Sequence, residues 1–343
     1  MRCRRRNGSR IRASAAEWLN GFEVLVIVKR WLRSAVFALL RFSGLPFLLR
    51  ELWQRNKVTI AVYHALPADR AAAHFAALRS RYHVIGLSDF LAARSNRTTD
   101  RLPPRALIIT FDDGHKSNYD LRPLLEAHRI PVTIFLCGGI VGTQRHYWWL
   151  HARNAANAQR LKALPDEQRT RELLNEGHTD TREYNTRHAL SRGEIEEMKG
   201  MVDFQSHTMF HPILPACSDE RAEQEIVESK QVLESQFGLR ICALAYPNGD
   251  FSDREILLLQ KAGYTCGLKL DSGVNDCETD LFQLRRVPLP DDAGINEVIV
   301  KTSGLWSLLT TIRSATRRRL RLGPATPAAH RGLPTTAREG GSA

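Results

Sequence analysis

The stretch Ala106-Leu107-Ile108-Ile109-Thr110-Phe111-Asp112-Asp113-Gly114 decides the fold. Six consecutive apolar or β-branched residues are typical of a strand that is buried on both faces, as in a parallel sheet covered by helices. The strand ends abruptly in two carboxylates, and the carboxyl ends of parallel strands are where α/β enzymes carry their sites. Asp112 and Asp113 are therefore candidate functional residues. The alternative is a plain Asp-Asp-Gly turn that caps the next helix.

Similar apolar runs alternate with helical patterns along the chain, which predicts an α/β fold with a mainly parallel sheet. The expected strands are Val58–His64, Tyr82–Gly86, Ala106–Asp113, Val132–Cys137, Val202–His207, Ile241–Pro247, Tyr264–Leu270 and Gln283–Pro288. The expected helices between them are Ala71–Ser80, Leu121–His128, Asp219–Phe237 and Asp253–Ala262. The long polar stretch 148–200 is interpreted as a helical excursion between two strands.

The composition places these elements in one large domain with appendages. The 343 residues include 43% hydrophobic and 25% charged residues, which excludes a wholly disordered chain and a collagen-like repeat. Six cysteines without CxxC spacing suggest neither a cysteine zinc module nor a disulfide framework. The net charge of +12 comes from the ends, since residues 1–57 carry +10 and residues 311–343 carry +6. We therefore predict a basic N-terminal helical segment at 1–57, one α/β domain at 58–310 and a basic tail at 311–343, disordered from Gly323 onward.

The N-terminal segment is expected to form one or two amphipathic helices over residues 17–53. Such a helix packs on the domain, lies on an anionic membrane surface or spans the membrane, and the sequence leaves these three alternatives open. The segment contains no stretch of 18 uncharged residues, and no apolar run with a small-residue cleavage site marks a secretory signal. The expectation is a cytoplasmic protein with peripheral contact to the inner membrane surface.

A second expected strand, Val202-Asp203-Phe204-Gln205, leads into Ser206-His207-Thr208-Met209-Phe210-His211-Pro212. Two histidines four residues apart can converge on one metal ion, although the pair alone is weak support for a metal site. Together with Asp113 they would supply two imidazoles and one carboxylate and would leave positions open on the ion. A third strand, Ile241–Ala245, ends in Tyr246-Pro247-Asn248-Gly249, for which a simple Asn-Gly turn is a sufficient local explanation.

With these three motifs in this order, the chain resembles the polysaccharide deacetylases, the NodB-type family also called the fourth carbohydrate esterase family, over residues 58–290. The resemblance implies a distorted (β/α) barrel and the metal-dependent hydrolysis of an N-acetyl, less often an O-acetyl, group on a sugar. By position, it implies that Asp113, His207 and His211 bind one divalent ion, most simply Zn²⁺ with Co²⁺ as an alternative. It implies equally that Asp112 is the general base that takes a proton from the attacking water.

The same resemblance extends to the third motif. The tetrahedral oxyanion is expected to be held by the ion and by the backbone N–H of Tyr246. Tyr246 and Pro247 are also expected to contact the substrate.

One departure from the family pattern concerns an arginine. Ala245 stands where many members carry an arginine that pairs with the catalytic aspartate, and Arg285 or Arg286 on the strand Gln283–Pro288 could replace it. Because side chains alternate along a strand, only one of the two can face the site. We expect Arg286 to do so, beside the base and the substrate.

A second departure concerns the general acid. Many members use a histidine near the last strand to protonate the departing amine, but no histidine lies between His211 and His330 here. His64, after the first strand, and His115, beside the aspartate pair, are the candidates, and a structural histidine is the alternative for each. We place His64 among the catalytic residues.

The leading prediction is a metal-dependent deacetylase that acts on an amino-sugar-containing polysaccharide, oligosaccharide or glycolipid. A non-catalytic glycan-binding barrel of the same family is the alternative, favoured by the missing arginine and histidine. Trp148 and Trp149 either stack on sugar rings or anchor the excursion to the barrel. Besides the carbohydrate or glycolipid substrate, the expected partner is an anionic membrane surface. Nucleic acid is not expected, because residues 58–310 carry a net charge of −4 and no recognition helix is recognisable.

Overall fold

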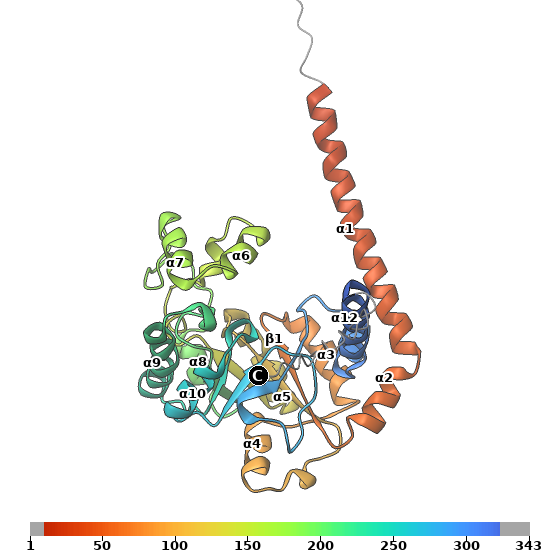
Figure 1. The fold of residues 1–343 in the computed structure, drawn as a ribbon, viewed down its shortest axis with the longest axis vertical. Coiled ribbons are helices and arrows are strands. Elements are labelled where there is room, and N and C mark those ends of the chain that lie inside the picture. The colour runs from red at the N-terminus through yellow and green to blue at the C-terminus, as the bar shows by residue number, and fades with distance from the viewer. Residues whose placement is uncertain (1–9, 323–343) are drawn as a thin grey trace, which may run out of the picture. The chain divides into compact units, whose positions relative to one another are not determined.

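The last two strands in the sequence, within residues 284–288, connect the two edges of the sheet and so form a parallel barrel. The computed structural model describes the backbone of residues 10–322 and the side chains of residues 26–313 (Figure 1). Within this part, nine strands form one sheet in the order β8-β7-β6-β5-β4-β3-β1-β9, with β2 paired to β3, and every pair is parallel. The strands are β1 Val58–Tyr63, β2 His83–Val84, β3 Ala106–Phe111, β4 Val132–Leu136, β5 Val202–Ser206, β6 Ala243–Ala245, β7 Cys266–Lys269, β8 Leu284–Arg285 and β9 Val287–Pro288.

The closing segment corrects one prediction. Residues 283–288 were expected to form one continuous strand, but β8 and β9 are two short strands separated by Arg286. β8 pairs with β7 while β9 pairs with β1, so the chain changes its strand partner at this residue. The strand expected at Tyr82–Gly86 is also shorter than predicted, because only His83 and Val84, which form β2, pair with β3. The seam of the barrel therefore lies at Arg286.

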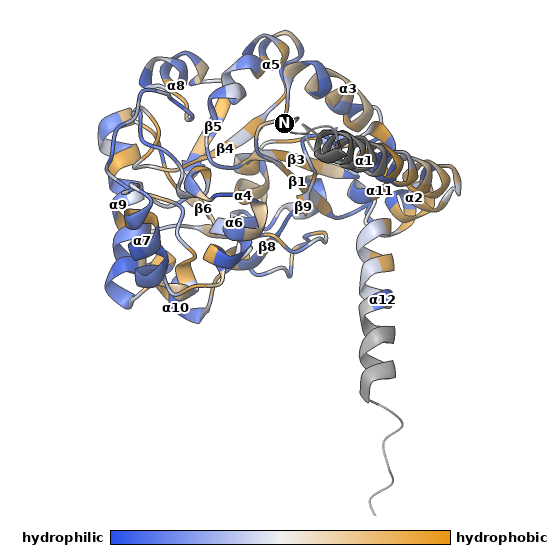
Figure 2. Ribbon diagram, turned by 90° about the horizontal axis from the view of Figure 1, so that it is seen from above, coloured by the Kyte–Doolittle hydropathy of each residue, from blue (hydrophilic) through white to orange (hydrophobic). Residues whose placement is uncertain are grey.

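Helices surround the strands, as the view onto the barrel shows (Figure 2). They are α3 Ala68–Arg79, α4 Leu87–Ser95, α5 Arg122–His128, α8 Arg192–Met198, α9 Asp219–Phe237, α10 Asp253–Lys261 and α11 Ile295–Thr302. The helical excursion predicted for residues 148–200 is confirmed. Before α8 it contains the short helix η4 Trp148–His151, α6 Ala155–Lys162 and α7 Asp166–Asn175.

Strand β3 is buried along its whole length, and its side chains alternate between two apolar layers. Leu107, Ile109 and Phe111 pack in the large cluster under the surrounding helices. Ile108 packs in a second cluster with Phe135, together with residues of β1, β6, β7 and β8, which fills the interior of the barrel. The alternation places Asp112 in register with the interior residues, at the carboxyl end of the barrel.

The segments before and after the barrel are helical. Where helices were expected over residues 17–53, the chain forms α1 Arg10–Phe42, which begins before residue 17, then α2 Leu45–Leu48 and a π-helical turn, Leu49–Trp53. Contacts divide the chain into two units, Met1–Ser307 and Leu308–Ala343, and the barrel lies in the first. Helix α12, Leu305–Leu322, continues across residue 311, where the basic tail was expected to begin. The part of the tail expected to be disordered, from Gly323, lies outside the described residues.

Candidate active site

The first element of the site is the turn that follows β3. Asp113 and Gly114 both have positive φ angles, 72° and 70°, so the chain turns sharply as the strand ends. A Cβ atom on Gly114 would lie 2.6 Å from Cδ2 of Leu136, so glycine suits this position both for space and for backbone conformation. Tyr147 donates its hydroxyl to the carbonyl oxygen of Asp113 at 3.0 Å. The turn thereby directs the Asp113 carboxylate away from the strand and fixes its backbone.

The second element is the loop after β5. His207 is the first residue beyond the strand, and its N–H donates to the carbonyl of Leu136 at 2.8 Å. Thr208 and His211 have positive φ angles, 65° and 57°, which fold the loop back on itself. The N–H of His211 donates to Oγ1 of Thr208 at 3.1 Å. This local fold brings two histidines four residues apart to the same side.

Helix α9 and the excursion hold this loop in place. Glu225 on α9 accepts the backbone N–H groups of Met209 and Phe210 at 2.8 and 2.9 Å. Trp148 donates its indole N–H to the carbonyl oxygen of His211 at 3.0 Å. Burial raises the pKa of Glu225 to about 7, an effect that Arg221 opposes. The buried Glu225 side chain thus accepts two hydrogen bonds from the backbone of the His207–His211 loop and fixes its conformation.

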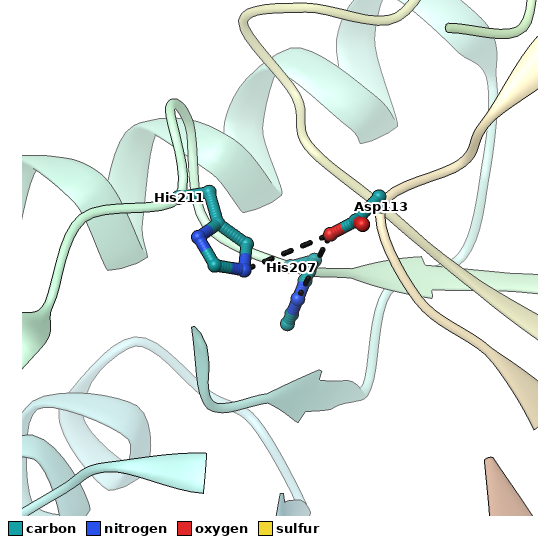
Figure 3. A group of neighbouring side chains, drawn as sticks. All are labelled: Asp113, His207 and His211. Carbon is teal, nitrogen blue, oxygen red and sulfur yellow. Dashed lines mark ion pairs between the residues drawn. The ribbon is translucent and has the colours of Figure 1, made fainter. Parts of the chain in front are cut away.

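Asp113, His207 and His211 meet at one point (Figure 3). Nε2 of His207 lies 3.5 Å and Nε2 of His211 lies 3.6 Å from Oδ1 of Asp113. One ligand atom from each residue lies within 4.8 Å of the others. The Nδ1 of His207 is 2.7 Å from the carbonyl oxygen of Ala245, which orients the ring so that Nε2 points at the other two residues.

The chemistry of these three side chains fits a divalent cation. Oδ1 of Asp113 is buried, and none of the described residues donates a hydrogen bond to it. Burial raises the pKa of Asp113 and lowers that of His211 well below its usual value, since a dry pocket disfavours charge on both groups. A cation among two imidazoles and one carboxylate would satisfy the orphaned oxygen, and such a ligand set leaves coordination positions open for chemistry.

Asp112 is held by a different partner. Arg286 donates to both of its carboxylate oxygens, with N–O distances of 2.6 and 2.9 Å, and the Arg286 side chain has no exposed surface. Burial by itself would raise the pKa of Asp112, but Arg286 and then His207 lower it to about 2. Oδ2 of Asp112 lies 3.9 Å from Nε2 of His207. An ionised carboxylate beside a cation site is what a general base requires.

A pocket of about 450 Å³ opens above Asp113 and His211. Its polar lining comes from five parts of the chain: the end of β1, the turn after β3, the excursion, the loop after β5 and the loop after β6. The polar residues are His64, Asp113, His115, Lys162, His188, His211 and Asn248. Two of the three metal-ligand candidates, Asp113 and His211, thus line a cavity large enough for a sugar unit.

The comparisons with known proteins agree with this geometry. The family model described as polysaccharide deacetylase matches residues 99–267. Residues 99–267 form a domain of the polysaccharide deacetylase family. A poly-beta-1,6-N-acetyl-D-glucosamine N-deacetylase of Staphylococcus epidermidis is 24% identical over 204 residues, which cover 56% of this chain and 57% of that protein. The chain therefore spans about half the length of the curated relatives it matches.

Two solved structures share the barrel. IcaB from Ammonifex degensii has a TM-score of 0.54 and 19% identity, and covers 72% of this chain and 97% of its own. The Streptococcus pyogenes deacetylase PplD, solved in complex with acetate, has a TM-score of 0.53 and 20% identity, and covers 72% and 98%. At this identity the likeness shows the fold, which agrees with the predicted distorted (β/α) barrel of the polysaccharide deacetylases.

The third motif of this deacetylase-family domain behaves differently from its prediction. The N–H of Tyr246 donates to the carbonyl of Leu268 at 2.9 Å and its hydroxyl donates to the carbonyl of Phe282 at 3.0 Å. Tyr246 and Pro247 are buried, and neither lines the pocket. The prediction of Tyr246 as oxyanion donor is wrong, because its N–H is used in the pairing of β6 with β7. Asn248, two residues further on, reaches the pocket instead.

Arg286 is placed as predicted beside Asp112, but for another reason. The prediction assumes one continuous strand, but the strand is interrupted at Arg286. The Arg286 side chain points into the barrel, with its guanidinium carbon 5.5 Å from the centre of the Phe135 ring. Arg285 lies outside, with 48% of its side chain exposed and Asp271 at 3.7 Å. The predicted substrate contact of Arg286 is wrong, since a fully buried guanidinium cannot reach a ligand in the pocket.

Both histidines that are candidates for the general acid, His64 and His115, line the pocket. The backbone N–H of His64 donates to Asp291 at 3.2 Å, and Asn118 donates to its carbonyl at 2.8 Å, so its loop is fixed at both ends. The ring of His115 is engaged, with its Nδ1 2.8 Å from the hydroxyl of Ser117, and burial lowers its pKa. Electrostatic attraction to His64 lowers the pKa of both Asp112 and Asp113.

The excursion supplies residues that sequence reasoning missed. Lys162 on α6 donates to Oδ1 of Asn248 at 2.7 Å, and His188 completes the rim beside His115. The two tryptophans divide the roles that were alternatives for them. Trp148 is buried and anchors the loop of His211, whereas Trp149 is half-buried, lies 4.6 Å from the His211 ring and faces the pocket. The sequence around Lys162 and His188 contains no motif that marks them as pocket residues, because their position depends on how the excursion folds over the barrel.

Proposed function

We propose that this chain is a metal-dependent hydrolase that removes an N-acetyl group from an amino-sugar-containing polysaccharide, oligosaccharide or glycolipid. The observation that carries the proposal is the meeting of Asp113, His207 and His211 beside the ionised Asp112, where Asp113 and His211 line the pocket. The relatives named poly-beta-1,6-N-acetyl-D-glucosamine N-deacetylase make a β-1,6-linked N-acetylglucosamine oligomer the first substrate to test.

The residues of the chain divide the reaction among them. A divalent ion held by Asp113, His207 and His211, with Zn²⁺ as the simplest choice, would polarise the acetyl carbonyl and acidify a water molecule. Asp112 takes a proton from that water as its oxygen bonds to the acetyl carbon. The carbon–nitrogen bond then breaks, and His64 delivers a proton to the departing amine. The products are acetate and the free amino sugar.

Arg286 acts through Asp112 and does not touch the substrate. The bidentate pair orients the carboxylate and keeps it ionised at neutral pH. The non-catalytic alternative depended on the missing arginine at Ala245 and on the missing general-acid histidine. The guanidinium of Arg286, between β8 and β9, takes the place of the missing arginine on Asp112. Trp149 offers an aromatic face at the pocket on which a sugar ring could stack.

The test begins with metal content, because it does not depend on the choice of substrate. We expect about one divalent ion per chain in the purified protein and its loss in His207→Ala and in His211→Ala. His188→Ala is the matched control, since it removes a histidine from the same pocket outside the ligand set. Acetate release from the β-1,6-linked oligomer is then measured with the metal-loaded protein. Absence of metal after reconstitution, or metal content unchanged in both variants, would overturn the proposal.

A further inference from the structure

Helix α1 carries an apolar face that the rest of the described chain leaves uncovered. Trp31, Leu39 and Phe42 are 75–76% exposed, and Val28 and Leu32 are exposed with them. Their spacing of three, four and seven residues places them on one side of the helix. Of the 19 large apolar side chains that are exposed among the described residues, 13 lie between Val26 and Trp53.

The opposite side of α1 carries charge and faces the barrel domain. Arg33 pairs with Glu297 at 2.8 Å and with Asp292 at 3.2 Å. Arg41 donates to Asn296 at 2.6 Å, and Phe37 packs between these two arginines against Val300 of α11. A helix on the surface of a soluble protein turns its apolar side inward and its charges outward. Helix α1 has the reverse arrangement, so its outer face requires an apolar partner.

The uncovered face continues beyond α1. After the left-handed Gly44, Phe47, Leu52 and Trp53 are exposed on α2 and the following turn, and Figure 2 shows hydrophobic residues gathered along α1 and α2. Among the described helices, none is long and apolar enough to cross a membrane by itself. Residues Val26–Phe42 and Leu45–Trp53 meet that criterion only as a pair bent by 57°. A sharply bent apolar surface suits the boundary layer of a bilayer better than a straight crossing.

Positive charge borders the apolar face. Arg30 and Arg70 line a pocket of about 320 Å³ with Arg33, and no described residue forms an ion pair with Arg30 or Arg70. The acidic residues of that pocket are Asp292 and Glu297, which are already paired with Arg33. The pocket therefore offers two uncommitted guanidinium groups next to exposed apolar side chains. Phosphate groups of anionic lipids match that combination.

We propose that the face formed by α1, α2 and residues 49–53 inserts into the interface of an anionic lipid bilayer, with Arg30 and Arg70 contacting lipid phosphates. Aromatic side chains such as Trp31 and Trp53 are favoured at that depth, since one end of the ring is apolar and the other meets water. A second copy of the chain would cover the apolar residues but would present the same positive charge to the arginines. The proposal does not depend on the deacetylase activity.

The experiment is flotation of the full-length chain with vesicles of phosphatidylcholine alone or mixed with phosphatidylglycerol. We expect binding to the anionic vesicles that weakens as salt is raised. The variant Trp31→Ser/Leu39→Ser/Phe42→Ser should lose at least about tenfold in binding, because it removes most of the inserted apolar area. Arg30→Glu/Arg70→Glu should lose about tenfold or more on anionic vesicles and little on neutral ones. Leu257→Ser, which removes an exposed leucine on α10, is the matched control and should bind like the parent.

Three outcomes would overturn the proposal. The first is failure of the parent chain to bind anionic vesicles. The second is unchanged binding by the triple serine variant, with circular dichroism showing that it is folded. The third is a lipid-free dimer in sedimentation that the triple variant converts to monomers, which would make a second copy the partner. Acetate release from a soluble oligomer should be the same in the triple variant and the parent, since none of the three residues lies at the pocket.

Discussion

The mouth of the barrel and helix α1 place their arginines and apolar residues in opposite ways. At the barrel mouth, Arg286 is fully buried and holds both oxygens of Asp112, while the surrounding apolar side chains exclude water. On α1, Arg33 lies against the domain with 36% of its side chain exposed, while apolar residues point outward. Each region leaves something unsatisfied: a buried carboxylate oxygen on Asp113 in the first, and an uncovered apolar stripe in the second.

The difference teaches what kind of partner each region needs. A polar atom that is buried without a hydrogen bond costs free energy until a cation or donor reaches it. An apolar face in water costs free energy until another apolar surface covers it. The barrel mouth therefore calls for an ion and a polar substrate, and α1 calls for a lipid or protein surface.

The largest expected effect is on activity at the barrel mouth. Asp112→Asn removes the proposed general base, so acetate release should fall by about 10²- to 10⁴-fold. The variant should bind as much metal as the parent, since the proposed ligands Asp113, His207 and His211 are unchanged. Asp271→Asn, a half-exposed aspartate beside Arg285, is the matched control and should be nearly as active as the parent. Activity that survives Asp112→Asn would remove this residue from the mechanism.

The two arginines should differ strongly in their contribution to the free energy of unfolding. Arg286→Met leaves a buried carboxylate unpaired and should cost about 3–5 kcal/mol. Arg33→Met removes the ion pairs of a partly exposed guanidinium with Asp292 and Glu297, and should cost about 0–1 kcal/mol because Glu297 keeps Lys301 as a partner. Denaturant unfolding of both variants measures the difference. The double variant Arg286→Met/Asp112→Asn should recover part of the loss, and equal costs for the two arginines would contradict the contrast between the regions.

In the metal-free protein, the arginines of the two regions should also differ in their effect on the pH dependence of the free energy of unfolding. The pKa of Asp112 is lowered from 3.8 to about 2 in the folded chain, despite burial, by Arg286 and His207. As the pH falls, Asp112 is protonated at a higher pH in the unfolded chain than in the folded chain. The ionised Asp112 therefore contributes its full stabilisation of the folded state above about pH 4, and this contribution is lost as the pH falls through about 2. Arg286→Met should flatten the stability profile over that window, measured by unfolding at each pH. Arg33→Met should leave the profile parallel to that of the parent.

The smallest effect concerns the two tryptophans of the excursion. Trp149→Ala should raise KM for the oligomer about tenfold and change kcat less, because a stacking surface for the sugar is lost. Trp148→Ala should instead lower thermal stability and kcat together, since it frees the loop of His211. If Trp149→Ala left KM unchanged, the ring would serve only to pack against Tyr147 and His211.

Much of the fold was predictable because its signals are local. The buried run of β3 and the amphipathic pattern of α9 each contain their own pattern, and α9 begins and ends at the predicted residues, Asp219 and Phe237. Asp113 and His207 lie within two residues of a strand end, His211 follows His207 by four residues, and parallel strands bring their carboxyl ends to one edge. Their meeting in space was therefore expected from the order of strands and motifs.

The remaining features depended on distant contacts. The partner of Asp112 comes from 174 residues further along the chain, at the one residue where the barrel closes. The N–H of Tyr246 is not free to bind an oxyanion because it donates to Leu268 of β7. The sequence of one strand does not determine which other strand it pairs with.

Helix α1 shows the boundary most simply. Its sequence alone determined which residues share a face, because the helical repeat is a local property. Only the tertiary structure decided which face meets the domain, since Arg33 and Arg41 find Glu297 and Asn296 on α11. The apolar face is left outside for that reason, where it awaits a partner that the chain itself does not supply.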